Sequence, residues 1–184
     1  MAVLTEAARI LAKGKKLDRD VYFLATTGEE LGLLGAHAFA ENPPIPLDSI
    51  VAAFNIDSPA IGPAGQSATI VGHGLTALDA DIARAAKALK LKLAPSPAAE
   101  SFLRRQDGWA LLQHDVPAVM VGSNYSDGAR VERFMDRTYH RPSDEYSPAL
   151  DLSGAAETVG LQVALVRWFA NARTYPARSR GVLD

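Results

Sequence analysis

Short apolar runs without polar interruptions alternate along this chain with segments of helical periodicity, and this alternation constrains the fold more than any other feature. Such runs are typical of strands that are buried on both faces, as in a parallel sheet. Strands alternating with helices predict an α/β fold, a three-layer α/β/α sandwich with a mostly parallel central sheet. The predicted strands are residues 21–25, 50–56, 68–71 and 118–121, and the predicted helices are residues 3–12, 31–40, 75–89, 108–113 and 152–170.

The chain is long enough to bury one hydrophobic core. It has 184 residues, of which 48% are hydrophobic and 22% charged, as in ordinary globular domains. The last helical pattern ends near residue 170, so the expected domain covers residues 1–171 and is followed by a polar tail at 172–184. Residues 122–144 are predicted to form a long polar loop, and such loops in compact domains are often functional.

Charge and cysteine content exclude several classes of function. The formal net charge of −2 and the pI of about 6.1 give no basis for binding nucleic acid or an anionic membrane. The sequence contains no cysteine, which excludes disulfides, thiolate-bound zinc and a cysteine nucleophile. No run reaches the roughly 18 apolar residues that span a membrane. The N-terminal segment lacks the charge order of a signal peptide, so the compartment stays unknown.

Carboxylate and imidazole side chains follow three of the predicted strands. Glu29 and Glu30 come after the first strand, Asp57 directly after the second, and His140 in the loop that follows the last. Sites in open α/β sheets form beyond the carboxyl ends of the strands, so these side chains are expected to converge. Such ligands without thiolate are typical of a catalytic site for zinc or a similar divalent metal. One of two adjacent glutamates can bind the metal while the other takes a proton from metal-bound water.

Each of these positions also has a plain structural interpretation. The pair Glu29 and Glu30 suits the first turn of a helix, where acidic side chains interact favourably with the helix dipole. Asp57 can form an Asx turn ahead of Pro59, and His140 can be an ordinary loop histidine. Their occurrence together, in the order that a metal site needs, favours the functional interpretation.

Several motifs in this order resemble those of a known family. Residues 23–36, with the sequence FLATTGEELGLLGA, look like the signature of the M28 family of metallo-aminopeptidases. Residues 55–57 (NID) and 139–144 (YHRPSD) are similar to later motifs of the same family. The stretches RQDGW at 105–109 and VPAV at 116–119 resemble the segment before its late core strand. The resemblance implies a phosphorylase/peptidase-like zinc exopeptidase architecture.

The resemblance also implies a role for each matching residue. Glu29 would be the general base, Glu30 and His140 would bind one zinc ion, and Asp57 would bind the second. Asp144 would support His140 as a metal ligand without itself touching the metal. Two further residues are candidates. Asp107 would be a supporting or structural carboxylate, and Tyr125 would donate a hydrogen bond to the tetrahedral intermediate.

One part of the family pattern has no counterpart in this sequence. The family's site begins with a His-x-Asp motif on an earlier strand and an Asp that bridges both metals, and residues 1–28 contain neither. The chain is therefore expected to be N-terminally truncated, a partial catalytic domain with one zinc or none in place of two. Two protein ligands are one fewer than a catalytic zinc normally has, so weak metal binding and poor activity are expected. Missing strands would leave a sheet edge open, and homo-oligomerisation through this edge is expected.

By this resemblance the chain is a metallo-exopeptidase of aminopeptidase type, with a peptide as substrate and with no nucleic-acid or membrane partner. Two alternatives stay open: a glutaminyl-cyclase-like acyltransferase with one zinc, and a non-catalytic scaffold or interaction module on the same fold. Resembling proteins are often exported, which would make the parent protein periplasmic or secreted.

Overall fold

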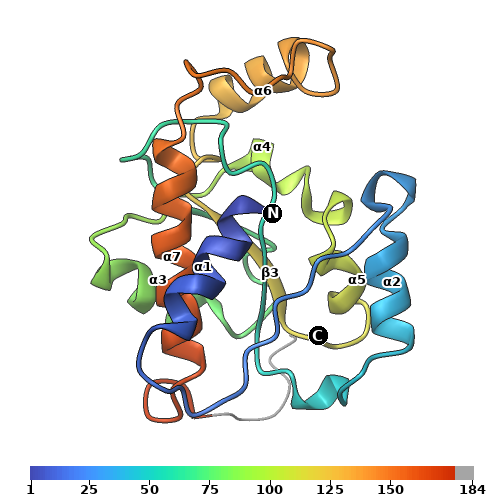
Figure 1. The fold of residues 1–184 in the computed structure, drawn as a ribbon, viewed down its shortest axis with the longest axis vertical. Helices are drawn as coiled ribbons and strands as arrows, with labels where there is room; N and C mark the ends of the chain where they lie inside the picture. Colours follow the sequence, from blue (N-terminus) through green and yellow to red (C-terminus); the bar gives the residue numbers. More distant parts are fainter. Residues whose placement is uncertain (177–184) are drawn as a thin grey trace.

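The chain folds as an α/β domain around a small sheet. The computed structural model describes residues 1–176 (Figure 1). Within this part of the chain no helix combines the length and apolar character that crossing a membrane requires. Its elements are α1 (Ala2–Ala12), η1 (Glu29–Leu31), α2 (Leu34–Glu41), η2 (Leu47–Ser49), β1 (Ala53–Asn55), β2 (Thr69–Val71), α3 (Asp79–Ala88), α4 (Pro97–Glu100), η3 (Leu103–Arg105), α5 (Gly108–Leu112), β3 (Ala118–Gly122), α6 (Gly128–Arg137) and α7 (Ser153–Phe169).

The sheet has the strand order β1-β3-β2. β1 runs parallel to β3, with Ala53 opposite Ala118, whereas β2 runs antiparallel to β3, with Ile70 opposite Val121. The α/β class is confirmed, but the described sheet is mixed, contrary to the mostly parallel sheet that was predicted. The physical reason is the connection at residues 57–68, which contains no crossover helix. A chain that returns from the same end of a sheet enters it antiparallel.

Both faces of β3 are covered by helices, because its side chains alternate between two apolar clusters. Val119 and Val121 pack with Leu78 and Ile82 near α3 and with residues of α7. Ala118 and Met120 face the other way and join clusters that include residues from α2, α4 and α5. All five residues of β3 are buried, as the continuous apolar run in the sequence predicts.

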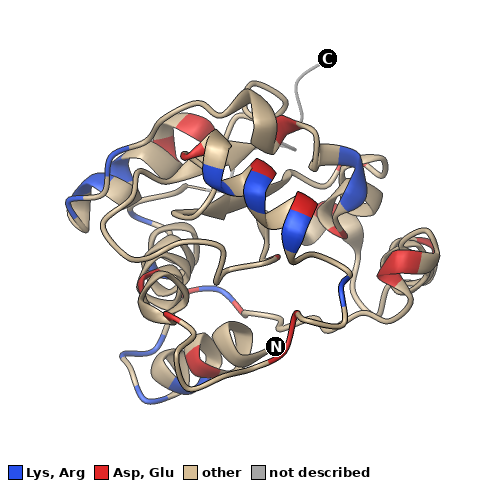
Figure 2. Ribbon diagram, turned by 90° about the horizontal axis from the view of Figure 1, so that it is seen from above, with Lys and Arg blue, Asp and Glu red and all other residues tan. Residues whose placement is uncertain are grey.

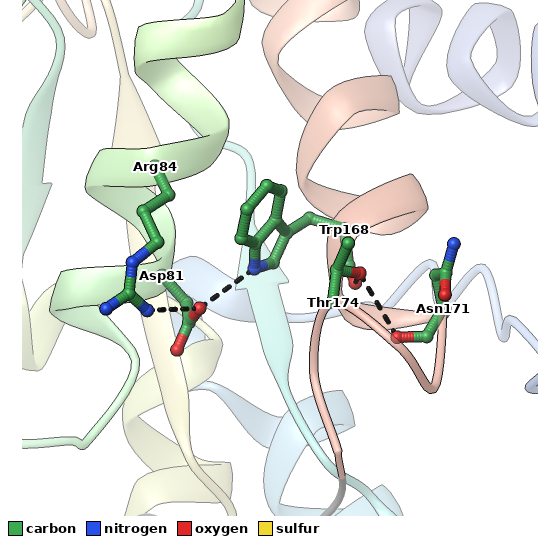
Figure 3. Close-up of polar contacts among 5 residues, drawn as sticks. All are labelled: Asp81, Arg84, Trp168, Asn171 and Thr174. Carbon is green, nitrogen blue, oxygen red and sulfur yellow. Dashed lines mark hydrogen bonds and ion pairs between the residues drawn. The ribbon is translucent and has the colours of Figure 1, made fainter.

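A polar contact joins α3 to α7 at the edge of the larger cluster (Figure 3). Asp81 Oδ1 accepts a hydrogen bond of 3.0 Å from Trp168 Nε1 and an ion-pair contact of 2.8 Å from Arg84. Just beyond α7, Thr174 Oγ1 donates to the Asn171 carbonyl over 3.1 Å. The chain therefore continues in an ordered turn at the start of the tail predicted at 172–184, whereas residues 177–184 lie outside the described part.

Residues 21–25, predicted as a buried strand, belong to no sheet. No backbone hydrogen bond joins residues 20–26 to another described residue. The side chains of Tyr22, Phe23 and Leu24 are 58%, 41% and 40% exposed. The prediction of a buried strand is wrong because a strand is defined by its partner, and no described strand lies along this segment.

Two other predicted elements are shorter than their sequence patterns. Of residues 50–56, only Ala53–Asn55 form a strand, since only these pair with β3. The helix predicted at 31–40 begins at Leu34, because Gly32 and Leu33 adopt left-handed φ angles of 95° and 58°. A left-handed pair interrupts helical hydrogen bonding, so the residues before it form only one 3₁₀ turn.

The predicted loop at 122–144 contains the ten-residue helix α6, so this prediction is wrong in its central part. The Asp127 side chain caps the helix by accepting a hydrogen bond from the Arg130 N–H over 3.1 Å. Val131 is buried against the core. The other face of the helix is highly charged, and Figure 2 shows basic and acidic residues interspersed along it. Because only Val131 of this helix is buried, its sequence is almost entirely polar and resembles that of a loop.

The loop after β1 is fastened to the start of α7. The N–H of Ala64 donates to Ser153 Oγ, and the N–H of Gly65 donates to Glu157, each over 3.0 Å. Gly154 lies against this loop so closely that a Cβ atom there would overlap the Gly62 carbonyl oxygen. The loop that follows Asp57 is thus held in one position by packing as well as by hydrogen bonds.

We predict that Gly154→Ala lowers the free energy of unfolding by about 1–3 kcal/mol, because overpacking forces the loop away from α7. Gly160→Ala is the matched control, since Gly160 lies in the same helix with no atom within 4 Å of its Cβ position. Alanine there is expected to be neutral or to stabilise by up to about 1 kcal/mol. Urea unfolding followed by circular dichroism measures both, and equal effects of the two substitutions would contradict the packing described.

Candidate active site

The turn that carries Glu29 and Glu30 depends on two glycines. Gly28 has a left-handed φ of 65° immediately before η1, a conformation that glycine adopts without steric cost. Gly35 approaches the Thr27 backbone so closely that a Cβ atom would lie 2.5 Å from the Thr27 nitrogen. Its own N–H donates to the Thr27 carbonyl over 2.8 Å. The spacing of these glycines therefore fixes a tight turn with two adjacent carboxylates at its end.

Glu30 meets His140 across a separation of 110 residues. Glu30 Oε1 lies 2.6 Å from His140 Nε2 and 3.4 Å from the hydroxyl of Tyr139. The Tyr139 and His140 rings stack with their centroids 3.8 Å apart. His140 has a left-handed φ of 55°, a conformation that costs a non-glycine residue energy and that concentrates at functional sites. The Glu30 and His140 side chains are 59% and 55% exposed, so a ligand has access to both.

Glu29 lies in an acidic environment. Partial burial raises the pKa of its carboxyl group, and the nearby charges of Glu30, Asp57 and Asp107 raise this pKa further, while Arg105 opposes them. These are the effects that shift carboxyl groups toward protonation at catalytic sites. The structure thus brings Glu29 into the electrostatic reach of three of the other predicted site residues.

The backbone of Asp57 is held by a buried tyrosine. The Tyr125 hydroxyl donates a short hydrogen bond to the Asp57 carbonyl oxygen. Tyr125 is only 2% exposed, and burial raises the pKa of its hydroxyl strongly, with a smaller contribution from Asp57. The Asp57 carboxylate itself accepts a hydrogen bond of 2.9 Å from Ser58. The structure thus directs the Tyr125 hydroxyl at the Asp57 backbone, while the charge of the Asp57 carboxylate acts on Glu29.

The remaining two predicted carboxylates differ in their surroundings. Asp107 Oδ2 accepts a hydrogen bond of 2.6 Å from Thr26, which ties the start of α5 to the chain just before the Glu29 turn. Its other oxygen, Oδ1, is shielded from solvent and has no hydrogen-bond partner among the described residues. Asp144 lies in an exposed turn, where its N–H donates to the Arg141 carbonyl. No hydrogen bond joins it to His140 in the described part of the chain.

Glu30 and His140 are the pair whose donor atoms suit a metal ion. A carboxylate oxygen and an imidazole nitrogen are both zinc ligands. Glu30 Oε1 and His140 Nε2 lie 2.6 Å apart, so the two side chains extend to the same place on the surface. Within residues 1–176 no group of three or more His, Cys, Asp or Glu side chains is arranged to hold a metal. A catalytic zinc normally has three protein ligands, so the pair fits zinc in chemistry but does not complete a site in number.

Three residues at the site did not emerge as candidates from the sequence. Thr26 bonds Asp107, Tyr139 stacks on His140, and the charge of Arg105 acts on both Glu29 and Tyr139. Each lies within three residues of a predicted site residue. Proximity in sequence was the available signal, but only the fold shows that these side chains turn toward the cluster.

Comparison with known proteins identifies a family for this chain. The family model described as Peptidase family M28 matches residues 1–165, which is most of the chain. No curated protein matches the chain, and no solved structure matches it.

We predict that Glu29→Gln stabilises the metal-free protein at neutral pH. A carboxyl group whose pKa is raised by folding destabilises the native state wherever it must ionise. The penalty is absent below the ordinary carboxyl pKa, grows as the pH rises above it, and is complete above the raised pKa of Glu29. Thermal unfolding in the presence of a chelator, at pH 3 and pH 7, measures the difference between wild type and variant. A difference that is the same at both values would contradict the raised pKa.

Proposed function

The chain belongs to peptidase family M28, and on this premise we propose that it hydrolyses the N-terminal bond of peptides, as a metallo-exopeptidase of aminopeptidase type. The observation that carries the proposal is the contact between Glu30 and His140 beside a second carboxylate, Glu29. Peptide hydrolysis needs a base that takes a proton from water and a group that polarises the scissile carbonyl. A free carboxylate next to a pair of metal-ligand side chains suits both requirements.

Glu29 is the proposed general base. Its pKa is raised above that of an ordinary carboxyl group, so a proton taken from water can be retained and then passed to the leaving amine. Glu29 has no ion-pair or hydrogen-bond partner among the described side chains, unlike Glu30. The division of labour between the two neighbours follows from this difference in contacts.

The excess of negative charge supports action at the N-terminus of the substrate. Glu29, Glu30, Asp57 and Asp107 surround the site, and Arg105 is the cation that acts on it within the described part of the chain. Such a field attracts the ammonium group of a free N-terminus and repels a C-terminal carboxylate. The acidic cluster therefore favours an aminopeptidase over a carboxypeptidase.

Glu30 and His140 would hold the metal ion that M28 peptidases generally use. When bound, such an ion lowers the pKa of water and polarises a carbonyl group. Because the described residues provide two of the three usual protein ligands, we propose that this chain binds zinc weakly on its own and turns over substrate slowly.

We predict that zinc binds this chain without the tight, stoichiometric isotherm of a complete site, and that His140→Ala weakens the binding further by at least about tenfold. The matched control is His114→Ala, since His114 lies at the exposed end of α5. Isothermal titration calorimetry measures all three proteins. Tight binding by wild type, or equal losses in the two variants, would count against Glu30 and His140 as the ligand pair.

We further predict that Glu29→Gln lowers the rate of leucine-anilide hydrolysis in saturating zinc by about 10²- to 10⁴-fold, the usual contribution of a general base. Glu41→Gln, at the end of α2, is the control and is expected to retain the wild-type rate. Amino-acid release is followed by absorbance and mass spectrometry. Wild-type activity in Glu29→Gln would overturn its assignment as the base. In a parallel assay with a peptide that begins with glutamine, pyroglutamate as the product would favour an acyltransferase.

A further inference from the structure

Arg105 is an accessible cation beside a site whose other charged groups are mainly acidic. Its charge acts on both Glu29 and Tyr139. The side chain is exposed, and its guanidinium group forms no ion pair or hydrogen bond with another described residue, unlike those of Arg84 and Arg130. A guanidinium group binds carboxylates through two parallel hydrogen bonds. Arg105 is therefore able to bind a carboxylate that a substrate brings.

A series of aromatic contacts leads from Arg105 to the backbone of Asp57. The guanidinium carbon of Arg105 lies 5.7 Å from the centroid of the Phe102 ring, within the range of a cation–π contact. The ring centroids of Phe102 and Tyr125 are 5.9 Å apart, and the Tyr125 hydroxyl donates to the Asp57 carbonyl oxygen. The guanidinium group is thus positioned by an aromatic ring that belongs to the site. Contact with a ring face leaves its N–H donors available to a ligand.

The backbone that carries Arg105 is anchored on its C-terminal side. The next residue, Gln106, is buried, and its side chain hydrogen-bonds to the backbone both before and after it. Asp107 then accepts the 2.6 Å hydrogen bond from Thr26, which lies just before the turn that carries Glu29. These contacts fix the position from which the Arg105 side chain extends toward the site.

The neighbouring arginine, Arg104, has different surroundings. Its guanidinium carbon lies 5.3 Å from the centroid of the Trp109 ring, and its charge is not among those that act on Glu29 or Tyr139. Both arginines are exposed. The chain therefore offers two adjacent residues of the same type, of which Arg105 acts on the site and Arg104 does not.

The two ends of a short peptide carry opposite charges, and the site offers a partner for each. Glu29 and the acidic residues around it attract the ammonium group, and they repel a carboxylate except where a cation outweighs them. Arg105 is the cation that acts there in the described part of the chain. On the basis of the proposed aminopeptidase function, we propose that Arg105 binds a carboxylate of the substrate and makes the chain prefer short or acidic peptides to neutral ones.

Two matched pairs of peptides test this preference in saturating zinc: Leu-Gly against Leu-Gly-amide, and Leu-Asp-amide against Leu-Asn-amide. In wild type, kcat/KM is expected to be at least about threefold higher for the carboxylate member of one pair or both, the size of effect that an exposed ion pair can give. A preference in the first pair identifies the C-terminal carboxylate as the ligand, and one in the second pair identifies an acidic side chain. Arg105→Gln is expected to abolish the preference, whereas Arg104→Gln, the matched control, is expected to keep it.

The same peptides are also titrated into the metal-free proteins in the presence of a chelator, where they stay intact, and NMR measures each Kd. The carboxylate member is expected to bind more tightly to wild type and to Arg104→Gln, again by at least about threefold, but not to Arg105→Gln. Because each preference is a ratio within one protein, a general loss of stability in a variant does not produce or remove it.

The two measurements separate this proposal from the proposed function. Tighter binding of the carboxylate peptides without hydrolysis of any peptide would contradict the proposed function but support the role of Arg105. The absence of a preference from wild type in both measurements, or a preference that survives Arg105→Gln, would overturn the role of Arg105 and leave hydrolysis unaffected. Equal losses for both members of a pair in Arg105→Gln would likewise overturn it, in favour of a cation that only balances the acidic side chains.

Discussion

The structure depends on the burial of a single strand, β3. All five of its residues are buried, both other strands hydrogen-bond to it, and its side chains enter apolar clusters on both faces of the sheet. Burial of apolar surface stabilises the folded state by about 25 cal/mol per Å². Because β3 is covered on both faces of the sheet, side chains on both of its faces contribute this free energy. Of the candidate site residues, Asp57 follows β1, which β3 holds in register.

The acidic cluster combines a fixed part with an accessible part. Asp57 is fixed through its backbone by the buried Tyr125, and Asp107 through its contact with Thr26. Glu30 and His140 are more than half exposed, so their contact gains little from a low dielectric and leaves both side chains free to exchange partners. Asp57 and Asp107 therefore keep their positions, while Glu30 and His140, the pair that would hold a metal, stay open to solvent.

A cavity of about 710 Å³ beside β1 borders the acidic cluster, because Asp107 both lines this cavity and raises the pKa of Glu29. Apolar side chains such as Phe23 and Leu24 are usually covered, and here they are about 40% exposed along a stretch without backbone partners.

The sequence by itself determined the α/β class and the family of the protein, because both depend on local patterns and motifs. It also supplied the candidate residues of the site. Gly28 and Gly35 shape the turn through their own backbone conformation and lack of a side chain, so the sequence alone predicts it. The apolar run at 118–121 likewise predicts a buried strand. The tertiary structure alone decided what these elements meet. Residues 21–25 have the composition of a strand but remain unpaired, because strand formation depends on a partner edge that composition cannot supply. It likewise decided that Glu30 contacts His140 while Tyr125 bonds the Asp57 backbone, because contacts between residues far apart in sequence depend on how the whole core packs.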